Sequence, residues 1–375
     1  MAGKLGNGEG TIRKRSDGRW EVRIVLEGGV RKSLYAKTRQ EASRLLAQAR
    51  RDREDGVSAF TDRQTVEQYL TTWLEGTKAS TTEVSSYVRI QFDVRRCLIP
   101  RLGSYQLRKL TGQQVQAFYG QMLGEGYAAS TVKHMHTTLH DALQTAVKLG
   151  LVHRNVADLV DPPRVLQREM DVLTEQQVRT LLDTVKGDRL EAVIVLALAT
   201  GLRAGELMAL QWHDVNLDSG VLQVRRTLKR VSRGYGFGRA KTKRSHRPIA
   251  LPTMATEALQ KHHAAQLEER AQAKDAWQDL DLVFCNEIGQ RISRHTFQGY
   301  SWFGRVLRAA GLPHVRFHDL RHTAATLLLA RGVNVKVVSE MLGHSSISVT
   351  LSLYAHVLPH MQRDAAATMD DLLRG

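Results

Sequence analysis

The chain of 375 residues has little that would anchor it in a membrane or cross-link it. Its two cysteines, Cys97 and Cys285, stand alone in the sequence, which favours a reducing cytoplasm over an oxidising compartment. The longest apolar run, Ala192 to Ala199, is far shorter than the roughly 20 residues of a membrane span. Residues 1–10 contain one lysine and no hydrophobic stretch. We therefore expect a cytoplasmic protein without a signal peptide.

The sequence also lacks the usual signatures of metal-dependent or nucleotide-dependent chemistry. It has no Walker-type glycine loop, no paired carboxylate cluster and no Cys/His grouping at zinc spacing. These absences agree with a function that uses no metal ion, no ATP and no other cofactor.

Acidic residues are the minority charge, with 38 Asp and Glu against 54 Lys and Arg, which gives a formal net charge of +16. Such an excess favours a polyanionic partner. Basic residues are most concentrated at residues 225–247, a segment with ten basic residues and no acidic one. The basic residues lie in interspersed patches and no basic amphipathic helix stands out, so the composition favours DNA over a membrane surface.

The segment from Phe317 to Val357 gathers residue types suited to phosphoryl transfer on DNA. His318 and Arg321 are three positions apart, so in a helix, or in a turn entering one, they point the same way. His344 follows a Leu-Gly pair, and Tyr354 comes ten residues later. Two imidazoles, a guanidinium and a phenol thus occur within one short stretch.

Two upstream segments complete this pattern. Leu198 to Trp212 reads LATGLRAGELMALQW, and Arg239 to Leu251 is a basic turn between two strand-like runs. Together the three segments resemble the active-site boxes of the tyrosine site-specific recombinases, the phage integrase family. The resemblance is strong from about Leu173 onward and looser before it. It implies a catalytic set with one supporting acidic residue: Arg203, Lys241, His318, Arg321, His344 and Tyr354, supported by Glu206.

The chemistry of phosphodiester attack explains these residue types. Guanidiniums stay charged and offer planar forks of donors, so Arg203 and Arg321 are expected to clamp the scissile phosphate. A tyrosine hydroxyl with a pKa of about 10 needs a base, a role we expect of His318, whereas His344 would donate to the phosphate. A lysine among cations, Lys241, would protonate the leaving 5′ oxygen. The product is a 3′-phosphotyrosyl enzyme, which a 5′ hydroxyl reverses without ATP or metal.

Each of these residues also has a structural alternative. Arg203 and Glu206 are suited to a simple salt bridge, and Tyr354 alone to a half-buried place between leucines. Several basic residues compete for the role of Lys241, and Lys243 is the second choice. Four other histidines are interpreted as structural, solvated or surface residues: His213, His322, His356 and His360.

The length predicts several domains, and we expect three. The expected fold class is multidomain: a small α+β N-terminal domain with a three-stranded sheet and a helix, an all-α core-binding domain, and a mainly α catalytic domain with a β-hairpin or small sheet. The expected bounds are residues 1–60, 61–162 and 173–375, with a linker at 163–172 where Asp161-Pro162-Pro163 disfavours helix.

Residues 1–60 carry 14 basic and 8 acidic side chains. Strands are predicted at residues 11–15, 19–26 and 30–34, with hairpin turns at Ser16-Asp17-Gly18 and Glu27-Gly28-Gly29 and a helix at Arg39 to Arg53. This pattern resembles the arm-type DNA-binding domain of many integrases. A solvated, charged sheet face is the alternative. The expected DNA contacts are Arg13, Arg15, Arg19, Arg23 and Arg31.

Residues 61–162 read as helices. Val132, Met135, Leu139, Leu143 and Val147 repeat at helical spacing. Capping boxes are predicted at Thr111 with Gln114 and, in the next domain, at Thr174 with Gln177. In the family such a domain binds the core recombination site. Lys133 is an expected DNA contact, with a plain solvent-facing side chain as the alternative.

The catalytic domain is expected to contain one β-hairpin with arms at Val221 to Thr227 and Arg247 to Leu251, and a flexible glycine-rich loop at Arg233 to Arg239. Three further basic residues are expected at its DNA-facing rim: Arg239, Lys243 and Arg244. The C-terminal tail has an apolar helix face formed by Ala365, Met369, Leu372 and Leu373, which would pack on a neighbouring protomer or on its own domain.

The resemblance implies an integrase that integrates or excises a mobile element in a prokaryotic cytoplasm, associated with the nucleoid. Its expected partners are double-stranded DNA with core-type and arm-type sites, a homo-tetramer on synapsed DNA, a directionality factor and a DNA-bending host protein. A type IB topoisomerase would share the catalytic set without needing the N-terminal domain. A non-catalytic DNA-binding regulator would explain the charge alone.

Overall fold

A computed structural model of the chain describes residues 10–25, 31–54, 63–166, 171–230, 234–239, 246–297, 301–354 and 359–374. Contacts divide the chain into two units, residues 1–167 and 168–375. The boundary lies within the expected linker, of which residues 167–170 are outside the described residues. The expected fold class is confirmed, because small antiparallel sheets accompany mainly helical segments. None of the helices in the described ranges is long and apolar enough to cross a membrane.

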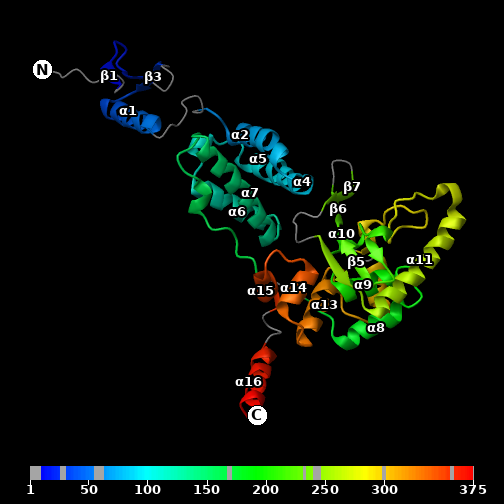
Figure 1. The fold of residues 1–375 in the computed structure, drawn as a ribbon. Helices are drawn as coiled ribbons and strands as arrows, with labels where there is room; N and C mark the ends of the chain where they lie inside the picture. Colours follow the sequence, from blue (N-terminus) through cyan, green and yellow to red (C-terminus); the bar gives the residue numbers. More distant parts are fainter. Residues whose placement is uncertain are drawn as a thin grey trace. The chain divides into compact units, whose positions relative to one another are not determined.

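The first unit begins with an antiparallel sheet covered on one face by a helix (Figure 1). Strands β1 (Thr11–Lys14), β2 (Trp20–Val25) and β3 (Arg31–Ala36) precede helix α1 (Arg39–Glu54). Because side chains alternate along a strand, Val22 and Ile24 pack with Ala42 and Leu46 of α1 while their neighbours face the other way. The predicted first turn is present, with Gly18 at φ +80°. The predicted turn Glu27-Gly28-Gly29 lies outside the described residues.

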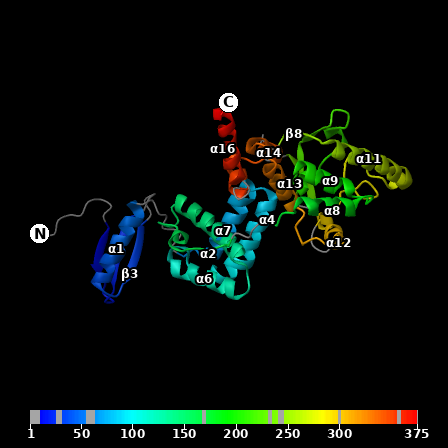
Figure 2. The same ribbon diagram turned by 90° about the horizontal axis from the view of Figure 1, so that it is seen from below.

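The rest of the first unit is helical, and its two longest helices, α6 and α7, lie side by side (Figure 2). The predicted face of α7 is buried from Val132 to Leu143, and Thr111 caps α6 in the predicted capping box with Gln114. The helical elements, with π turns at η3 and η4 and 3₁₀ turns at η5 and η6, are α2 (Val66–Thr72), η3 (Trp73–Lys78), α3 (Ala79–Thr81), α4 (Val84–Phe92), η4 (Asp93–Leu98), α5 (Ile99–Leu102), η5 (Leu107–Lys109), α6 (Gly112–Gly124), α7 (Ala129–Lys148) and η6 (Val156–Leu159).

The second unit is mainly helical and opens with the predicted capping box of Thr174 and Gln177. Its helices are α8 (Glu175–Val185), α9 (Glu191–Thr200), α10 (Ala204–Leu207), η7 (Trp212–Asp214), α11 (Thr253–Ala273), η9 (Lys274–Ala276), η10 (Arg294–Phe297), α12 (Trp302–Ala309), α13 (Asp319–Ala330), α14 (Val335–Leu342), α15 (Ile347–Tyr354) and α16 (Pro359–Arg374). Its strands are β4 (Val215–Asn216), β5 (Val221–Val224), β6 (Arg226–Arg230), β7 (Tyr235–Arg239) and β8 (Arg247–Ala250).

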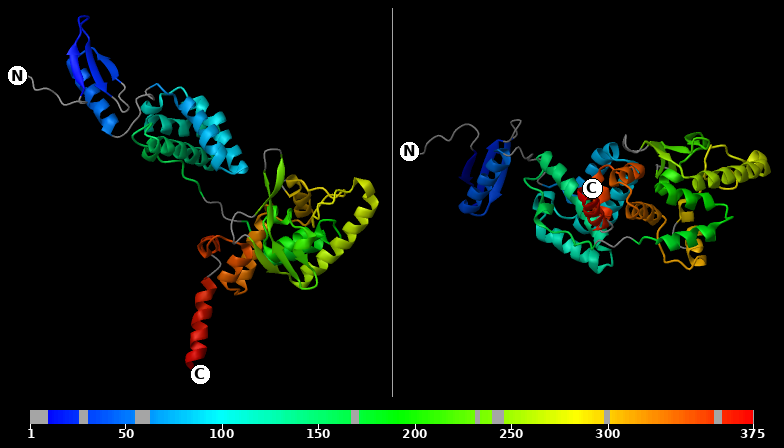
Figure 3. Two further views of the ribbon diagram at one scale, coloured as in Figure 1. Left: turned by 45° about the horizontal axis from the view of Figure 1, so that its top comes forward. Right: turned by 60° about the horizontal axis from the view of Figure 1, so that its bottom comes forward.

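The predicted hairpin is partly correct. Strands β5 and β8 pair as its arms in a sheet of order β4-β5-β8, but the expected glycine-rich loop contains a strand, β7, which pairs with β6 (Figure 3). The Lys229 side chain of β6 lies against Gly238 of β7, where a Cβ would come 2.7 Å from Lys229 Cδ. Arg291 supports the strand by binding the Tyr235 carbonyl and covering the Phe237 ring. The loop prediction was therefore wrong for Tyr235–Arg239.

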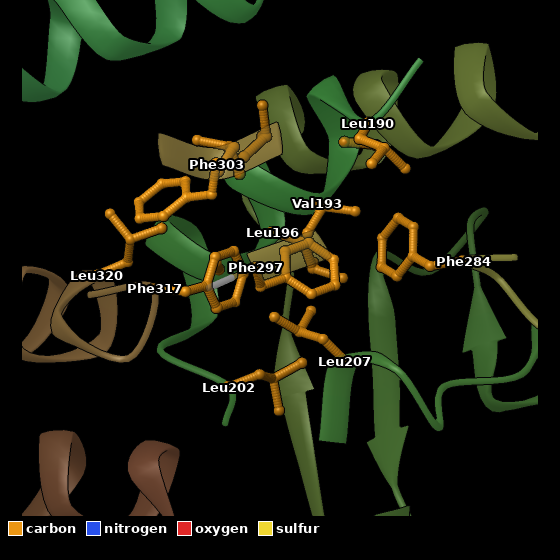
Figure 4. Packing of buried hydrophobic residues seen from close by; sticks show 14 of the residues in the cluster. Leu190, Val193, Leu196, Leu202, Leu207, Phe284, Phe297, Phe303, Phe317 and Leu320 are labelled. Carbon is orange, nitrogen blue, oxygen red and sulfur yellow. The ribbon is translucent and has the colours of Figure 1, made fainter. Parts of the chain in front are cut away.

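The largest buried core of the second unit holds the segments around Arg203 and around His318 and Arg321 (Figure 4). Leu202 and Leu207 lie in this core, and so do Phe317 and Leu320. The Phe317 ring lies 4.6 Å, between ring centroids, from that of Phe297. Leu202 and Leu207 flank Arg203, and Phe317 and Leu320 flank His318, so one core holds both segments in place.

Candidate active site

Arg203 lies at the N-terminal end of α10, directly after the turn that ends α9. Gly201 makes this turn at φ +61°, and a Cβ there would lie 2.5 Å from Leu342 Cδ2. The Arg203 guanidinium donates to Glu206 Oε1 at 3.0 Å and to the carbonyls of Leu342 and Gly343 at 3.4 and 3.2 Å. Its side chain is still 39% exposed. It is therefore both held in place and open to solvent.

Glu206 is buried and serves two arginines. Besides Arg203, it accepts hydrogen bonds from Arg247, whose Nη2 lies 3.0 Å from Oε2. Burial alone would raise the pKa of Glu206, but the hydrogen bond and charge of Arg247, together with Arg203, hold that pKa below its usual range. Glu206 is therefore a carboxylate at neutral pH, as its supporting role requires.

Arg321 lies in the first turn of α13 and is only 3% exposed. Its Nη1 donates to the carbonyl of Gly201 at 2.7 Å, and its Nη2 to that of Leu342 at 2.8 Å. Burial and the nearby charge of Arg203 lower the pKa of Arg321 to about 9, so the group remains charged at neutral pH. In this structure, two donors of the Arg321 fork are thus turned to backbone carbonyls.

Three guanidiniums meet at the C-terminal end of α14. Arg247 Nε donates to the carbonyl of Met341 at 2.7 Å, and Arg203 and Arg321 share the carbonyl of Leu342. A helix C-terminus carries partial negative charge, which offsets repulsion among the cations. We call Arg203, Arg247, Arg321 and Glu206 the arginine cluster.

His344 follows this helix end through Gly343, which has φ +65°. Its Nδ1 lies 2.7 Å from the hydroxyl oxygen of Thr350, a buried residue of α15. Burial, followed by the charges of Arg321 and Arg203, lowers the pKa of His344 to about 4. The imidazole is therefore neutral at neutral pH, and Thr350 fixes which nitrogen faces away from it.

His318 precedes α13 on a turn that an ion pair holds in shape. Asp319 is buried and accepts hydrogen bonds from the backbone N–H of Arg316 at 2.8 Å and from its guanidinium at 2.8 and 3.0 Å. His318 itself is exposed. Desolvation by the surrounding protein, then the charges of His322 and Arg321, lower its pKa to about 4, so this imidazole is also neutral at neutral pH.

Tyr354 ends α15 and is completely buried, with 0% exposure. It packs with Ala325, Leu329, Val338 and Leu342. Its hydroxyl oxygen lies 2.7 Å from Nδ1 of His322, one turn along α13 from His318. Burial raises the pKa of Tyr354 to about 12, although Arg321 opposes the rise. His322, interpreted from the sequence as structural or solvated, pairs with the candidate nucleophile in this structure.

Some of the other predicted site residues lie outside the described residues, and the rest are described. Lys241, Lys243, Arg244 and His356 lie outside the described residues, as do the side chains of Arg31, Arg239, His360 and Ala365. Lys133 is exposed on α7, and His213 is an exposed residue that contacts Asp281. In the first unit, Arg13 and Arg23 both bond the buried carboxylate of Glu21, at 2.6 and 3.1 Å. Arg15 and Arg19 approach Asp17 and the ring of Tyr35.

Three residues of the site had no assigned role from sequence. Arg247 is one of the ten basic residues at 225–247, and its place at the start of a predicted hairpin arm did not indicate a role in the site. His322 had one usable signal, its position four residues after His318, which places both on one helix face. Thr350 had a similar signal, four residues before Tyr354 on α15.

A surface cavity of ≈ 590 Å³ lies against this end of the site. Arg247, Gly343 and His344 line it, together with Lys336 and Ser346. The cavity thus borders both Arg247 and His344.

Comparisons with known proteins agree on one family. A family model described as the phage integrase family matches residues 171–361. An integrase of Streptomyces ambofaciens is 30% identical over 369 residues, with 94% of this chain and 90% of the relative covered. A XerC-like tyrosine recombinase of Caldanaerobacter subterraneus subsp. tengcongensis is 28% identical, with 92% of each chain covered.

Solved structures of similar fold come from the same group. The Tn1549 transposon integrase in complex with transposon right end DNA has a TM-score of 0.70 at 24% identity, covering 82% of this chain and 99% of its own. A lambda integrase dimer bound to a COC′ core site has a TM-score of 0.59 at 18% identity, covering 94% and 96%.

The chain belongs to the phage integrase family. It is a tyrosine recombinase, an enzyme that cuts and rejoins DNA strands in site-specific recombination.

Proposed function

We propose that Arg203, Lys241, His318, Arg321, His344 and Tyr354 form the catalytic set, supported by Glu206, and that cleavage yields a 3′-phosphotyrosyl enzyme. The observation that carries this assignment is the meeting of Arg203 and Arg321 at the carbonyl of Leu342, two residues before His344. Residues that are far apart in the sequence thus surround one point. A phosphate placed there would meet two cations and a neutral imidazole.

The two arginines have different positions for this task. Arg203 is the more exposed one and is proposed to contact the scissile phosphate directly. Arg321 lies deeper in the protein, where little water surrounds it. Its charge is therefore less screened and would stabilise a nearby phosphate more strongly. With Thr350 donating to Nδ1 of His344, the Nε2–H of His344 is the proposed donor to a non-bridging oxygen.

Attack by Tyr354 exchanges one phosphoester bond for another. The Tyr354 oxygen bonds to phosphorus, the bond from phosphorus to O5′ breaks, and Lys241 gives the leaving O5′ a proton. Neutral His318 takes the phenolic proton. Attack by a 5′ hydroxyl of a second duplex reverses these steps and rejoins the strand. Since Tyr354 is buried, we propose that DNA binding brings it out of its pocket before it attacks.

The wider partners are also proposals. Solved relatives include a lambda integrase tetramer bound to a Holliday junction, and we propose a tetramer on two synapsed sites for this chain. Met369, Leu372 and Leu373 of α16 are exposed, which favours packing on a neighbouring copy over packing on their own domain. We propose the integration and excision of a mobile element in a prokaryotic cytoplasm at the nucleoid, with core-type and arm-type DNA sites, a directionality factor and a DNA-bending protein.

The test uses attachment-site DNA taken from beside the gene. A duplex nicked just downstream of the scissile phosphate loses its short 5′-hydroxyl fragment after cleavage, which traps the covalent adduct. The wild-type protein should form a protein–DNA adduct at Tyr354, and Tyr354→Phe should form none. An adduct in the phenylalanine variant would refute the assignment. Joining of two cognate duplexes, without relaxation of plasmids that lack the site, separates recombination from topoisomerase activity.

A further inference from the structure

Arg247 is the one guanidinium of the arginine cluster to which neither the sequence nor the proposed function gives a role. It is the first residue of β8, and its side chain is 7% exposed, with its hydrogen bonds directed to groups of the protein. It donates to Glu206 at 3.0 Å and to the carbonyl of Met341 at 2.7 Å. It therefore bridges α10 and the C-terminal end of α14.

Both ends of this bridge lead to residues of the catalytic set. Glu206 also bonds Arg203, accepting from its guanidinium at 3.0 Å and from its backbone N–H at 3.1 Å. At the other end, Met341 lies three residues before His344 in the turn that presents the imidazole. Arg247 thus adds a second link between the first arginine and the turn before His344, beside the direct bonds of Arg203 to the carbonyls of Leu342 and Gly343.

The packing around the bridge is tight. A Cβ on Gly343 would lie 2.7 Å from Nη1 of Arg247 and 2.9 Å from its Cζ. The guanidinium therefore lies directly against the backbone of the Leu-Gly-His turn. A shorter or more mobile side chain at position 247 would leave this turn without its support.

We propose that Arg247 is a positioning residue of the cleavage reaction, which holds Arg203 and His344 in register by bridging Glu206 and the turn before His344. This inference rests on the proposed function of Arg203 and His344. The proposed role needs the planar fork of a guanidinium and not only a positive charge. The ammonium group of a lysine cannot donate to Glu206 and to the Met341 carbonyl in the same geometry. A displacement of about 1 Å at a catalytic group is enough to cost about 100-fold in rate.

The bridge also predicts a specific pH effect. The hydrogen bond and charge of Arg247 help to lower the pKa of Glu206, whereas burial raises it. Removing Arg247 leaves burial opposed by Arg203 alone, so the pKa of Glu206 rises. Glu206 then takes up a proton at a higher pH than in the wild type, and Arg203 loses its charged partner. The acid side of the pH–rate profile should therefore move to higher pH.

The experiment compares Arg247→Met and Arg247→Lys with Arg189→Met. Arg189 is a matched control, because it too bridges a carboxylate, that of Glu269, and a backbone carbonyl, that of Cys285, in the same unit. The substrate is the nicked attachment-site duplex, at saturating protein, from about pH 5 to about pH 8. The readouts are the single-turnover rate of adduct formation, the Kd for the duplex and thermal unfolding.

The expected result is a rate loss of about 100-fold in Arg247→Met with little change in Kd, and an acid limb shifted to higher pH. Arg247→Lys should recover part of both. Arg189→Met should lower thermal stability but keep the wild-type rate and acid limb. If Arg247→Met does not fold, the lysine variant decides: a shifted acid limb supports the inference, and an unshifted one overturns it.

Two results would overturn the inference. One is a wild-type rate with an unshifted profile in Arg247→Met. The other is an equal rate loss in both methionine variants without any shift. The failure of the proposed function is distinguishable, since the wild-type protein itself would then form no adduct at Tyr354.

Discussion

Among single residues, Tyr354 is the one whose surroundings most constrain the reaction. It is completely buried, and burial raises the pKa of its hydroxyl to about 12. Both features oppose attack from its present position, because the phenol is kept from the phosphate and from losing its proton. His322 satisfies the hydroxyl at 2.7 Å and so stabilises the buried position. This hydrogen bond therefore adds to the apolar packing of the ring in favouring the buried tyrosine.

We expect His322→Leu to favour the released tyrosine. A buried hydroxyl without a partner costs about 1–3 kcal/mol, which corresponds to a rise of roughly 5-fold to 150-fold in the released population. The measurement is nitration of Tyr354 in DNA-free protein, followed by mass spectrometry. His318→Leu is the control, since Tyr354 bonds His322 in this structure. Equal nitration in wild type and His322→Leu, or an equal rise in both variants, would contradict the expectation.

Hydrogen-bond partners that come from separate elements could not be predicted from the sequence. The segments around Arg203, His318 and His344 were recognisable because each local order of residues is characteristic. The bond between His322 and Tyr354 was not, because it depends on how α13 and α15 pack. Arg247 was hidden for the same reason, since only the tertiary fold distinguishes it within a uniformly basic run.

Among the elements, the short helix α14 organises the site. Its last carbonyls bind all three guanidiniums of the arginine cluster, and Gly343 then turns the chain toward His344. The turn needs glycine for two reasons: its φ of +65° and its contact with Arg247. The first reason concerns the backbone alone, whereas the second concerns the active site.

Two alanine substitutions separate these reasons. Gly332 follows α13 at φ +79° with open space around its Cβ position, so Gly332→Ala should cost only the backbone strain, about 1–2 kcal/mol in the free energy of unfolding. Gly343→Ala should cost more, because the new Cβ displaces Arg247, and adduct formation should slow by about tenfold or more. Denaturant unfolding and the nicked duplex give the two values. Equal stability and equal rate in the two variants would show that the Arg247 contact is unimportant.

The elements also show which signals are local. The capping boxes at Thr111 and Thr174 were predicted correctly because each is contained in four residues. The strand Tyr235–Arg239 was missed because its glycines indicate a loop, while its pairing with β6 and its contact with Arg291 come from elsewhere in the chain. The fold class followed from patterns of residues, but this pairing did not.

For the molecule as a whole, the net charge of +16 fits a DNA-acting enzyme, but it does not say which surface binds which DNA site. In the first unit, α1 covers one face of the sheet. At the turn between β1 and β2, Arg15 and Arg19 lie 5.3 and 5.7 Å from the centroid of the exposed ring of Tyr35. Arg13 and Arg23 are instead tied to Glu21. The first pair is thus the better probe of DNA binding, because its loss spares the buried carboxylate.

Replacing Arg15 and Arg19 together with glutamine should weaken binding to a long attachment-region duplex, while cleavage of the short nicked core duplex keeps its rate. Each lost phosphate contact lowers the slope of log K against log salt by about 0.9, so the slope should fall by about 1–2. The control replaces Arg44 and Arg51, two exposed arginines of α1, and removes the same charge. If the control weakens binding equally, the effect is one of net charge, and the open face of the sheet is not a specific DNA-binding surface.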